Sequence, residues 1–296
     1  MRVLSHTVSA AEDGRTVKEL LRGLWHISGS LLSRLKFRDA LTVNGVPVPV
    51  NRLLRAGDIL RADVSDLPGE NPHILPVDYP LTVLYEDEDL LLLDKPAGIA
   101  IHPAALTEET ATIAGAVAHY LQSDSFHAVN RLDRGTTGVM AVAKTGFVHA
   151  RCMTLLHTDG FQRDYRAVCD GLPPHPEGDI DLPLGRAEGS LLKRCPAPGG
   201  QSAHTHYQVL SAANGRALLR LTPTTGRTHQ LRVHMAAIGC PLTGDWLYGT
   251  EDKSLIARPA LHSYHLRMLH PVTGAVIDVT APLPEDIQRL LKEERL

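Results

Sequence analysis

A carboxylate with an arginine on either side is the first feature of this sequence that could do chemistry. It is Asp133, in the stretch Asn130-Arg131-Leu132-Asp133-Arg134-Gly135-Thr136-Thr137-Gly138. The apolar run from Val139 to Ala143 follows directly and predicts a buried strand. A carboxylate in a Gly- and Thr-rich loop beside such a strand can be fixed by backbone and side-chain donors, which favours catalysis. An Asp between arginines is also typical of a structural ion pair, so the loop alone leaves both interpretations open.

Three further stretches combine polar side chains with turn residues. They are Asp94–Pro103, which contains Lys95-Pro96-Ala97-Gly98; Arg163–Val168, which contains Tyr165; and Leu221–His234, which reads Leu-Thr-Pro-Thr-Thr-Gly-Arg-Thr-His-Gln-Leu-Arg-Val-His. His229 and His234 in the last stretch lie five residues apart, lack a His-Glu-x-x-His pattern and have no third ligand nearby. We therefore expect no metal at this position.

The elements that would position these residues fall into a front segment, a connection and a larger domain. In residues 1–66, the spacing of Val17, Leu20, Leu21 and Leu24 after Thr16 predicts a capped amphipathic helix. A second apolar set is interleaved with basic side chains, and Asn44-Gly45 between apolar runs predicts a hairpin. Residues 55–60 read as a turn that enters a last strand. The basic side chains of the second set are Arg34, Lys36 and Arg38.

Residues 67–80 are rich in proline and are interpreted as a linker, and residues 81–296 as one domain. This domain begins with a predicted hairpin (81–85 and 90–93) and a helix (110–121). The buried strand at 139–143, a helix at 147–156 and a strand at 166–169 follow. Because strands and helices mix without regular βαβ alternation, we expect an α+β fold around a mixed, largely antiparallel sheet.

Composition limits the remaining possibilities. The chain is 43% hydrophobic and 21% charged, which is ordinary for a globular protein, and it has no apolar run long enough to span a membrane or act as a signal peptide. We expect a cytoplasmic protein without membrane association. The four scattered cysteines predict buried thiols rather than disulfides or a zinc site. The net charge of −3 is not that of a typical nucleic-acid binder, but residues 1–66 carry ten Lys and Arg against seven Asp and Glu.

Together the four stretches, in this order, resemble the RluA-type pseudouridine synthases, and the front segment resembles the small alpha-L RNA-binding module. The match to the Arg-Leu-Asp motif places Asp133 at the position of the family's catalytic aspartate. This sequence has Asn130 and Thr137 where the family usually has His and Ser, and Gln201 where relatives often carry lysine. Asn130 cannot titrate near neutral pH, so a role that needs a charged histidine there is not expected.

The resemblance implies an enzyme that isomerises uridine to pseudouridine in structured RNA, ribosomal or transfer, by flipping the nucleotide out of its stack and using no metal or organic cofactor. It implies that Tyr165 lies against the target base and that Arg227 pairs with Asp133, because a guanidinium within about 4–6 Å keeps a partly buried carboxylate ionised. We expect a monomer whose RNA contacts come from the front module and from the cleft. The expected contacts are Arg34, Lys36, Arg38, Lys95, Arg131, Arg134 and His229.

Two other functions agree less well with the sequence. An RNA-binding protein without catalysis would be indicated by loss of Asp133 or Arg227, and both are present. A phosphatase-like hydrolase that uses Asp94 as nucleophile would need a second acid two residues later, where Pro96 stands. The sequence leaves open whether Asp133 attacks the base, attacks the sugar or removes a sugar proton.

Overall fold

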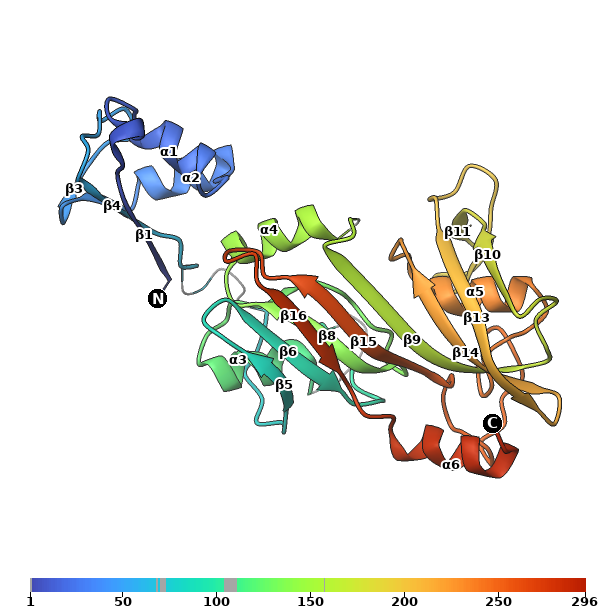
Figure 1. Cartoon of the computed structure of the whole chain (residues 1–296). Coiled ribbons are helices and arrows are strands. Elements are labelled where there is room, and N and C mark those ends of the chain that lie inside the picture. The colour runs from blue at the N-terminus through green and yellow to red at the C-terminus, as the bar shows by residue number, and fades with distance from the viewer. Residues whose placement is uncertain (1, 68, 70–72, 104–110, 157) are drawn as a thin grey trace.

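The computed structural model describes residues 2–67, 69, 73–103, 111–156 and 158–296. A small front module lies beyond one end of a larger domain, which is built on a long curved sheet (Figure 1). Helices and strands mix in both parts, so the α+β class expected from the sequence is confirmed. The predicted start of a helix at residue 110 lies outside the described residues.

The front module is a four-stranded antiparallel sheet with two helices packed on it. The helix α1 begins with a capping box, in which the hydroxyl of Thr16 accepts from the amide of Glu19 and the carboxylate of Glu19 accepts from the amide of Thr16. Asn44 and Gly45 both have positive φ, as a two-residue hairpin turn requires. The predicted helix and hairpin are therefore present. The elements are β1 (Val3–Thr7), a short 3-10 helix (Ala10–Glu12), α1 (Val17–Gly23), α2 (Gly29–Lys36), β2 (Leu41–Val43), β3 (Val46–Pro47) and β4 (Ile59–Asp63).

The larger domain contains a ten-stranded sheet in the order β10-β13-β14-β9-β15-β8-β6-β5, with β16 beside β15 and β7 beside β8. Among its described pairings, only β15 with β8 is parallel. A separate hairpin is formed by β11 and β12. The strands are β5 (Thr82–Glu86), β6 (Leu90–Lys95), β7 (His127–Ala128), β8 (Thr137–Ala143), β9 (Phe161–Asp170), β10 (Glu177–Asp181), β11 (Leu184–Arg186), β12 (Arg194–Pro196), β13 (His204–Ala213), β14 (Arg216–Pro223), β15 (Leu261–Leu269) and β16 (Val276–Thr280).

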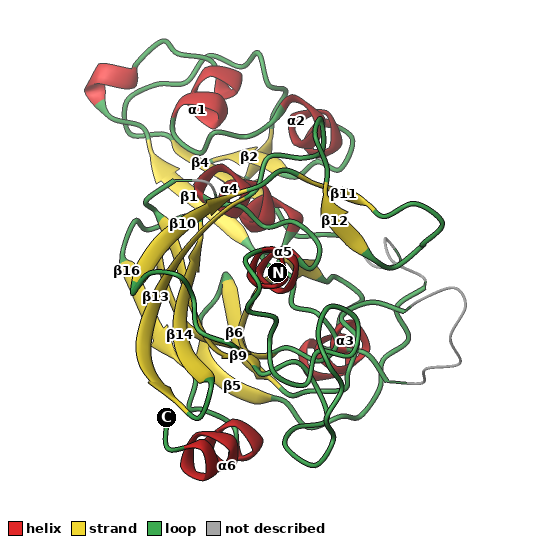
Figure 2. Ribbon diagram, turned by 90° about the vertical axis from the view of Figure 1, so that its right-hand side faces the viewer, coloured by secondary structure: helices red, strands yellow, loops and turns green. Residues whose placement is uncertain are grey.

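Helices cover both faces of this sheet. Successive side chains of a strand point to opposite faces, so the run of four leucines in β6 is buried on both sides. Leu91 and Leu93 share a core with α3 and α5, which lie on the concave side of the sheet in Figure 2, whereas Leu90 and Leu92 share a core with α4 and the front module. A smaller cluster joins α6 to β9. The helices are α3 (Ile113–Leu121), α4 (Gly146–Leu155), α5 (Gln230–Ala237) and α6 (Glu285–Glu294).

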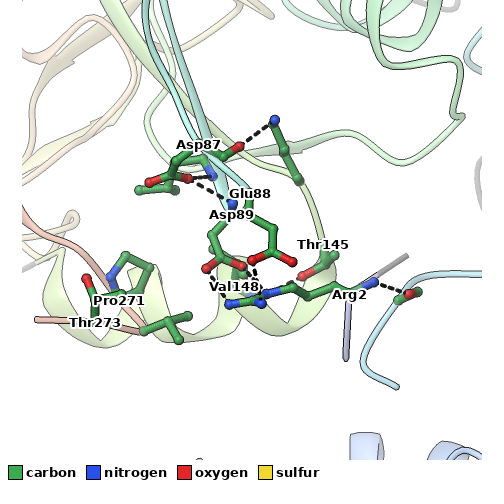
Figure 3. A network of polar contacts seen from close by, with 12 residues as sticks. Arg2, Asp87, Glu88, Asp89, Thr145, Val148, Pro271 and Thr273 are labelled. Carbon is green, nitrogen blue, oxygen red and sulfur yellow. Dashed lines mark hydrogen bonds and ion pairs between the residues drawn. The ribbon is translucent and has the colours of Figure 1, made fainter. Parts of the chain in front are cut away.

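The front module is joined to the larger domain by polar contacts as well as by this shared core. Figure 3 shows the guanidinium of Arg2 facing Glu88 and Asp89 in the turn between β5 and β6. It forms two hydrogen bonds to Asp89, of 2.7 and 2.8 Å, and one of 2.8 Å to Glu88. In addition, the guanidinium of Arg151 in α4 donates to the carbonyl of Trp25. Because these contacts involve separate parts of the module, they limit its rotation.

The chain is bonded to the larger domain just before the connection at 67–80 and again within it. Just before it, the carboxylate of Asp66 accepts from the amide of Gly146 and lies 2.7 Å from His127 Nε2. Within it, the amide of Val77 donates to the carbonyl of Gly115 in α3. The described part of this connection therefore runs along the domain surface.

Candidate active site

The backbone of the loop that carries Asp133 is hydrogen-bonded to the side chain of Lys95. This lysine is fully buried at the end of β6, and its ammonium donates to the carbonyls of Pro96, Arg134 and Thr136. Burial lowers the pKa of Lys95 to about 8, while the negative charge of Asp133 acts in the opposite direction. The expected contact of Lys95 with RNA is wrong, because a side chain that is fully enclosed and bonded to the loop backbone cannot reach a phosphate.

The two ends of this loop are fixed to the sheet. The side-chain oxygen of buried Asn130 accepts from the backbone amide of Ala141 at 2.7 Å, so Asn130 is bonded to β8. Thr137 Oγ1 lies 2.8 Å from Nδ1 of His262 on β15. Gly138 has a φ of 104°, and a Cβ there would lie 2.2 Å from the carbonyl oxygen of Ser263. The close approach of β8 and β15 thus requires glycine at this position.

The ion-pair partner of Asp133 is Arg232, not Arg227. Arg232 Nη1 lies 3.3 Å from Asp133 Oδ2, and the same guanidinium forms two hydrogen bonds of 2.7 Å to the fully buried Asp245. Arg227 instead donates through Nε to the carbonyl of Ser202 at 2.9 Å. The expected pair of Arg227 with Asp133 is therefore corrected: Arg227 precedes α5, whereas Arg232 projects from its first turn.

Tyr165 lies on β9 and lines the same cavity as Asp133. Its side chain is buried, and burial raises the pKa of the Tyr165 hydroxyl. The charge of Asp133 acts in the same direction, while Arg163 and a hydrogen bond with Ser263 act against it. The phenol therefore stays protonated at neutral pH.

Asp133 and Tyr165 face a cavity of about 510 Å³. This volume fits a single nucleotide-sized ligand. The carboxylate of Asp133 retains 28% of its exposure, so it is accessible from the cavity, whereas Arg232 behind it retains 6%. The cavity lining comes from the Asp133 loop, β9, the turn before α5 and the segment after β6; its polar members include His102, Asn130, Arg131, Asp133, Thr136, Arg163, Tyr165, Thr225, Arg227, Thr228, His229 and Arg232.

His229 lies inside this site. Its Nδ1 is 2.8 Å from the hydroxyl of Tyr248, and its Nε2 is 3.9 Å from Asp133 Oδ2. Burial lowers the pKa of His229, and the nearby cations of Arg232 and Arg194 act in the same direction against the carboxylates of Asp133 and Asp245. With only 8% of its side chain exposed, His229 can contact RNA only through a nucleotide that enters the cavity.

Two buried arginines of the site are absent from the residues expected on sequence grounds. Arg232 stands between Leu231 and Val233, and a charged residue inside an apolar helical run is a signal that could have identified it. Arg163 is also buried, and its Nε has no hydrogen-bond partner among the described residues. Its Nη2 makes only long contacts, of 3.4 and 3.5 Å, with the carbonyls of Thr225 and Pro223.

The remaining predicted RNA contacts are spread over two regions. Arg131 and Arg134 are exposed beside the cavity, where Arg134 Nε donates to the carbonyl of Gly98. Arg34 and Lys36 are exposed on α2 of the front module, which lies beyond the far side of α4 in Figure 1. Arg38 is half-buried and donates to the carbonyl of Ser65. The structure therefore does not gather these cations around one site.

His234 and three of the four cysteines are buried. His234 is buried between the hydroxyl of Thr205 and the carbonyl of Leu182. Within the described residues, no three His, Cys, Asp or Glu side chains lie close enough to hold a metal ion, and no helix is long and apolar enough to cross a membrane. All four cysteines are free thiols; Cys195 is half-buried, and the buried ones are Cys152, Cys169 and Cys240.

Comparison with known proteins identifies both parts of the chain. The RNA pseudouridylate synthase family matches residues 89–237, and the RluD ribosomal pseudouridine synthase N-terminal domain matches residues 4–60. The RNA pseudouridine synthase YjbO of Bacillus subtilis is 38% identical over 285 residues, which cover 94% of this chain and 99% of that protein. The ribosomal large subunit pseudouridine synthase D of Yersinia pestis is 34% identical and covers 97% of this chain and 93% of its own length.

A solved structure agrees with these matches. Human RNA pseudouridylate synthase domain containing 4 superimposes with a TM-score of 0.58 at 25% identity, over 72% of this chain and 93% of that chain. The chain belongs to the RNA pseudouridylate synthase family, in its RluA branch. It is accordingly a pseudouridine synthase, an isomerase that acts on RNA, as the motifs predicted.

Proposed function

We propose that this enzyme isomerises a uridine of ribosomal RNA with Asp133 as its catalytic group, after the nucleotide has flipped into the cavity. The observation that carries this proposal is the pairing of Asp133 with Arg232 at the wall of a nucleotide-sized cavity. Asp133 is exposed to the cavity, while Arg232 is fixed behind it by Asp245. A carboxylate that faces a ligand and has a fixed countercharge on its other side is suited to nucleophilic or base catalysis.

The reaction needs no redox partner. The bond between C1′ of ribose and N1 of uracil breaks, the base rotates, a bond forms between C1′ and C5, and the proton of C5 is transferred to N1. Asp133 acts either as nucleophile or as base on the sugar. Flipping the nucleotide costs on the order of a few kcal/mol, which binding to the RNA backbone must supply. Exposed Arg131 and Arg134 beside the cavity are positioned for such phosphate contacts.

Tyr165 has two possible roles at this site, and its environment separates them. Its ring can stack on uracil, and its hydroxyl can exchange the proton that leaves C5. Because burial raises the pKa of Tyr165, stacking needs no change of protonation, whereas action as a base requires the phenol first to lose its proton. Tyr165→Phe keeps the ring and removes the hydroxyl. Turnover close to wild type would assign Tyr165 to stacking, and a loss of about 100-fold or more, on the order of general-base effects, would assign it to proton transfer.

The decisive experiment uses Asp133→Asn, with Asp179→Asn as a matched control. Asp179 is an exposed carboxylate on β10 that contacts His204 and His206 and does not line the cavity. Pseudouridine is measured in transcripts by carbodiimide-dependent stops in reverse transcription, and RNA binding by filter retention. We expect Asp133→Asn to reduce turnover to background with binding retained, and Asp179→Asn to leave both unchanged. More than a few per cent of wild-type turnover in a folded Asp133→Asn protein would refute the assignment.

Ribosomal RNA is proposed as the target because relatives that align over most of the chain are named ribosomal large subunit pseudouridine synthase D. The match of residues 4–60 to the N-terminal domain of that group supports the same substrate. Mapping pseudouridines in ribosomal and transfer RNA from cells with and without the gene tests this directly. Loss of a modification in transfer RNA alone would overturn the ribosomal assignment and keep the enzyme class.

A further inference from the structure

A second cavity, of about 430 Å³, adjoins the catalytic one. The turn at Arg227 and Thr228 lines both cavities, so they share one wall. The rest of the second cavity is formed by the β11–β12 hairpin and by the turn that follows it; its remaining lining residues are Leu184, Gly185, Arg186, Arg194, Gly199, Gly200 and Gln201.

Three arginines define the charge of this second cavity. Arg186, Arg194 and Arg227 line it, and the described lining contains no Asp or Glu. None of the three forms an ion pair with a described carboxylate within 4.0 Å, whereas the half-buried or buried Arg216, Arg232 and Arg258 all do. The cavity is therefore strongly cationic.

The arrangement of these arginines is unfavourable without an anion. Arg186 and Arg194 are direct cross-strand partners in the β11–β12 ladder, and like charges at such positions destabilise a hairpin. Arg194 Nε is buried and has no hydrogen-bond partner among the described residues. An unpartnered buried donor is costly, whereas a guanidinium fork matches the oxygens of a phosphate.

The second cavity is also connected by hydrogen bonds to His229, which lies beside the catalytic carboxylate. The amide of Arg194 donates to the hydroxyl of Tyr248 at 2.8 Å, and that hydroxyl lies 2.8 Å from His229 Nδ1. Nε2 of His229 is in turn 3.9 Å from Asp133 Oδ2. An anion held by Arg194 would therefore stabilise β12, whose backbone is bonded to the Tyr248 hydroxyl that contacts His229.

We infer that this cavity binds a backbone phosphate of the substrate RNA, on a nucleotide next to the uridine that enters the catalytic cavity. Arg186 and Arg194 hold the phosphate from the hairpin side, and Arg227 holds it from the wall shared with the catalytic cavity. The two cavities share a wall, so they are adjacent. A nucleotide flipped into the catalytic cavity would therefore leave its neighbouring phosphodiester within reach of the second cavity. This inference rests on the proposed function, because it names where the RNA of that reaction is held.

The first test measures the salt dependence of RNA binding in an Asp133→Asn background, in which the RNA is not converted. Arg186→Gln, Arg194→Gln and the double variant are compared with Arg267→Gln, an arginine on β15 that lines neither cavity. Removal of one phosphate contact should reduce the slope of log K against log salt by about 0.7–0.9. We expect this reduction in the double variant and an unchanged slope for Arg267→Gln. Equal slopes in all proteins that melt cooperatively would overturn the inference, and Arg186→Gln, on an exposed side chain, keeps the test valid if Arg194→Gln fails to fold.

The second test places the phosphate. Synthetic RNA that the wild-type enzyme converts is prepared with one neutral methylphosphonate linkage at successive positions around the target uridine. Wild type should lose affinity at one flanking position, and the double variant should show no further loss there, because both changes remove the same contact. Additive losses would overturn the assignment. Failure of wild type to form pseudouridine in any RNA would instead contradict the proposed function, so the two outcomes are distinguishable.

Discussion

The catalytic cavity and the front module both depend on cationic side chains, but they hold them in opposite ways. Around Asp133, the charges of Lys95, Arg163 and Arg232 are buried, and Lys95 and Arg232 are bonded to fixed partners. On α2, Arg34 and Lys36 are exposed at the surface. Buried pairs are screened little by salt, whereas exposed charges act over about 10 Å at 0.1 M ionic strength. We therefore expect buried cations to control chemistry and stability, and exposed cations to control association with RNA.

The largest expected effect separates Arg232 from Arg227. Arg232→Met leaves the buried carboxylate of Asp245 without its partner and removes the countercharge of Asp133, a change that costs about 3–5 kcal/mol for a buried pair. We expect severe loss of turnover and a lower melting temperature. Arg227→Met, which removes a bond to a backbone carbonyl, should keep the fold and affect RNA binding more than the chemical step. Single-turnover rates at saturating RNA measure the difference, and a larger loss of that rate for Arg227→Met would reverse the assignment.

The next effect is a loss of stability in acid that depends on His262. Burial lowers the pKa of His262 to about 4 from 6.5, although a hydrogen bond to the carbonyl of Ala281 acts against this. Between these pH values the unfolded chain binds a proton that the folded chain does not, so stability falls as pH decreases from 6.5 to about 4, by roughly 3 kcal/mol in total. His262→Gln should be less stable at neutral pH but should flatten this slope. Urea unfolding across this pH range measures it, and parallel pH profiles for both proteins would contradict the prediction.

A smaller effect is expected at Lys95, which the sequence places among the RNA contacts but which is buried in the structure. Lys95→Met deprives three backbone carbonyls of a donor, one of them buried, so the free energy of unfolding should fall by about 1–3 kcal/mol. Affinity for RNA should remain that of the parent protein, because the side chain is enclosed. Denaturant titration and filter binding test both statements. Weaker RNA binding with unchanged stability would return Lys95 to the set of RNA contacts.

The smallest effect concerns the front module. Replacement of Arg34 and Lys36 by Gln should reduce the salt slope of RNA binding by up to about 0.9 for each phosphate contact that is removed, with little change in stability. The single-turnover rate at saturating RNA should stay at the parent value, because no residue of α2 lines the catalytic cavity. A reduced rate at saturation would indicate that the module also positions the substrate for chemistry.

Much of the fold could be predicted because its signals are local. The cap of α1 at Thr16, the turn at Asn44 and Gly45, and the buried strand after residue 138 each depend on neighbours in the sequence. The position of Asp133 beside Tyr165 required the family resemblance, because β8 and β9 are separated by β15 in the sheet. No local pattern specifies that pair.

The errors in the site have a common cause, which is that they depend on distant parts of the chain. Arg227 and Arg232 are only five residues apart, and the sequence does not reveal that α5 begins between them, at Gln230. The choice of partner for Asp133 depends on that helix start and on Asp245, which fixes the guanidinium from the other side. The burial of Lys95 is equally hidden, because lysine is almost always exposed and the loop that encloses it lies 39 residues or more away in the chain.

The parallel contact of Gly138 with Ser263 has a consequence for how this enzyme can vary. A methyl group at position 138 would meet the backbone of β15 itself, which no rotamer change can relieve. Any substitution there would push β8 and β15 apart directly beside the loop of Asp133. In a library that samples every amino acid between residues 130 and 143, we expect position 138 to tolerate glycine alone, even where the reaction makes no use of it. The residue at position 138 is then determined by the distance between the backbones of β8 and β15. Retention of glycine at this position would reflect the packing of the sheet and not contact with the nucleotide.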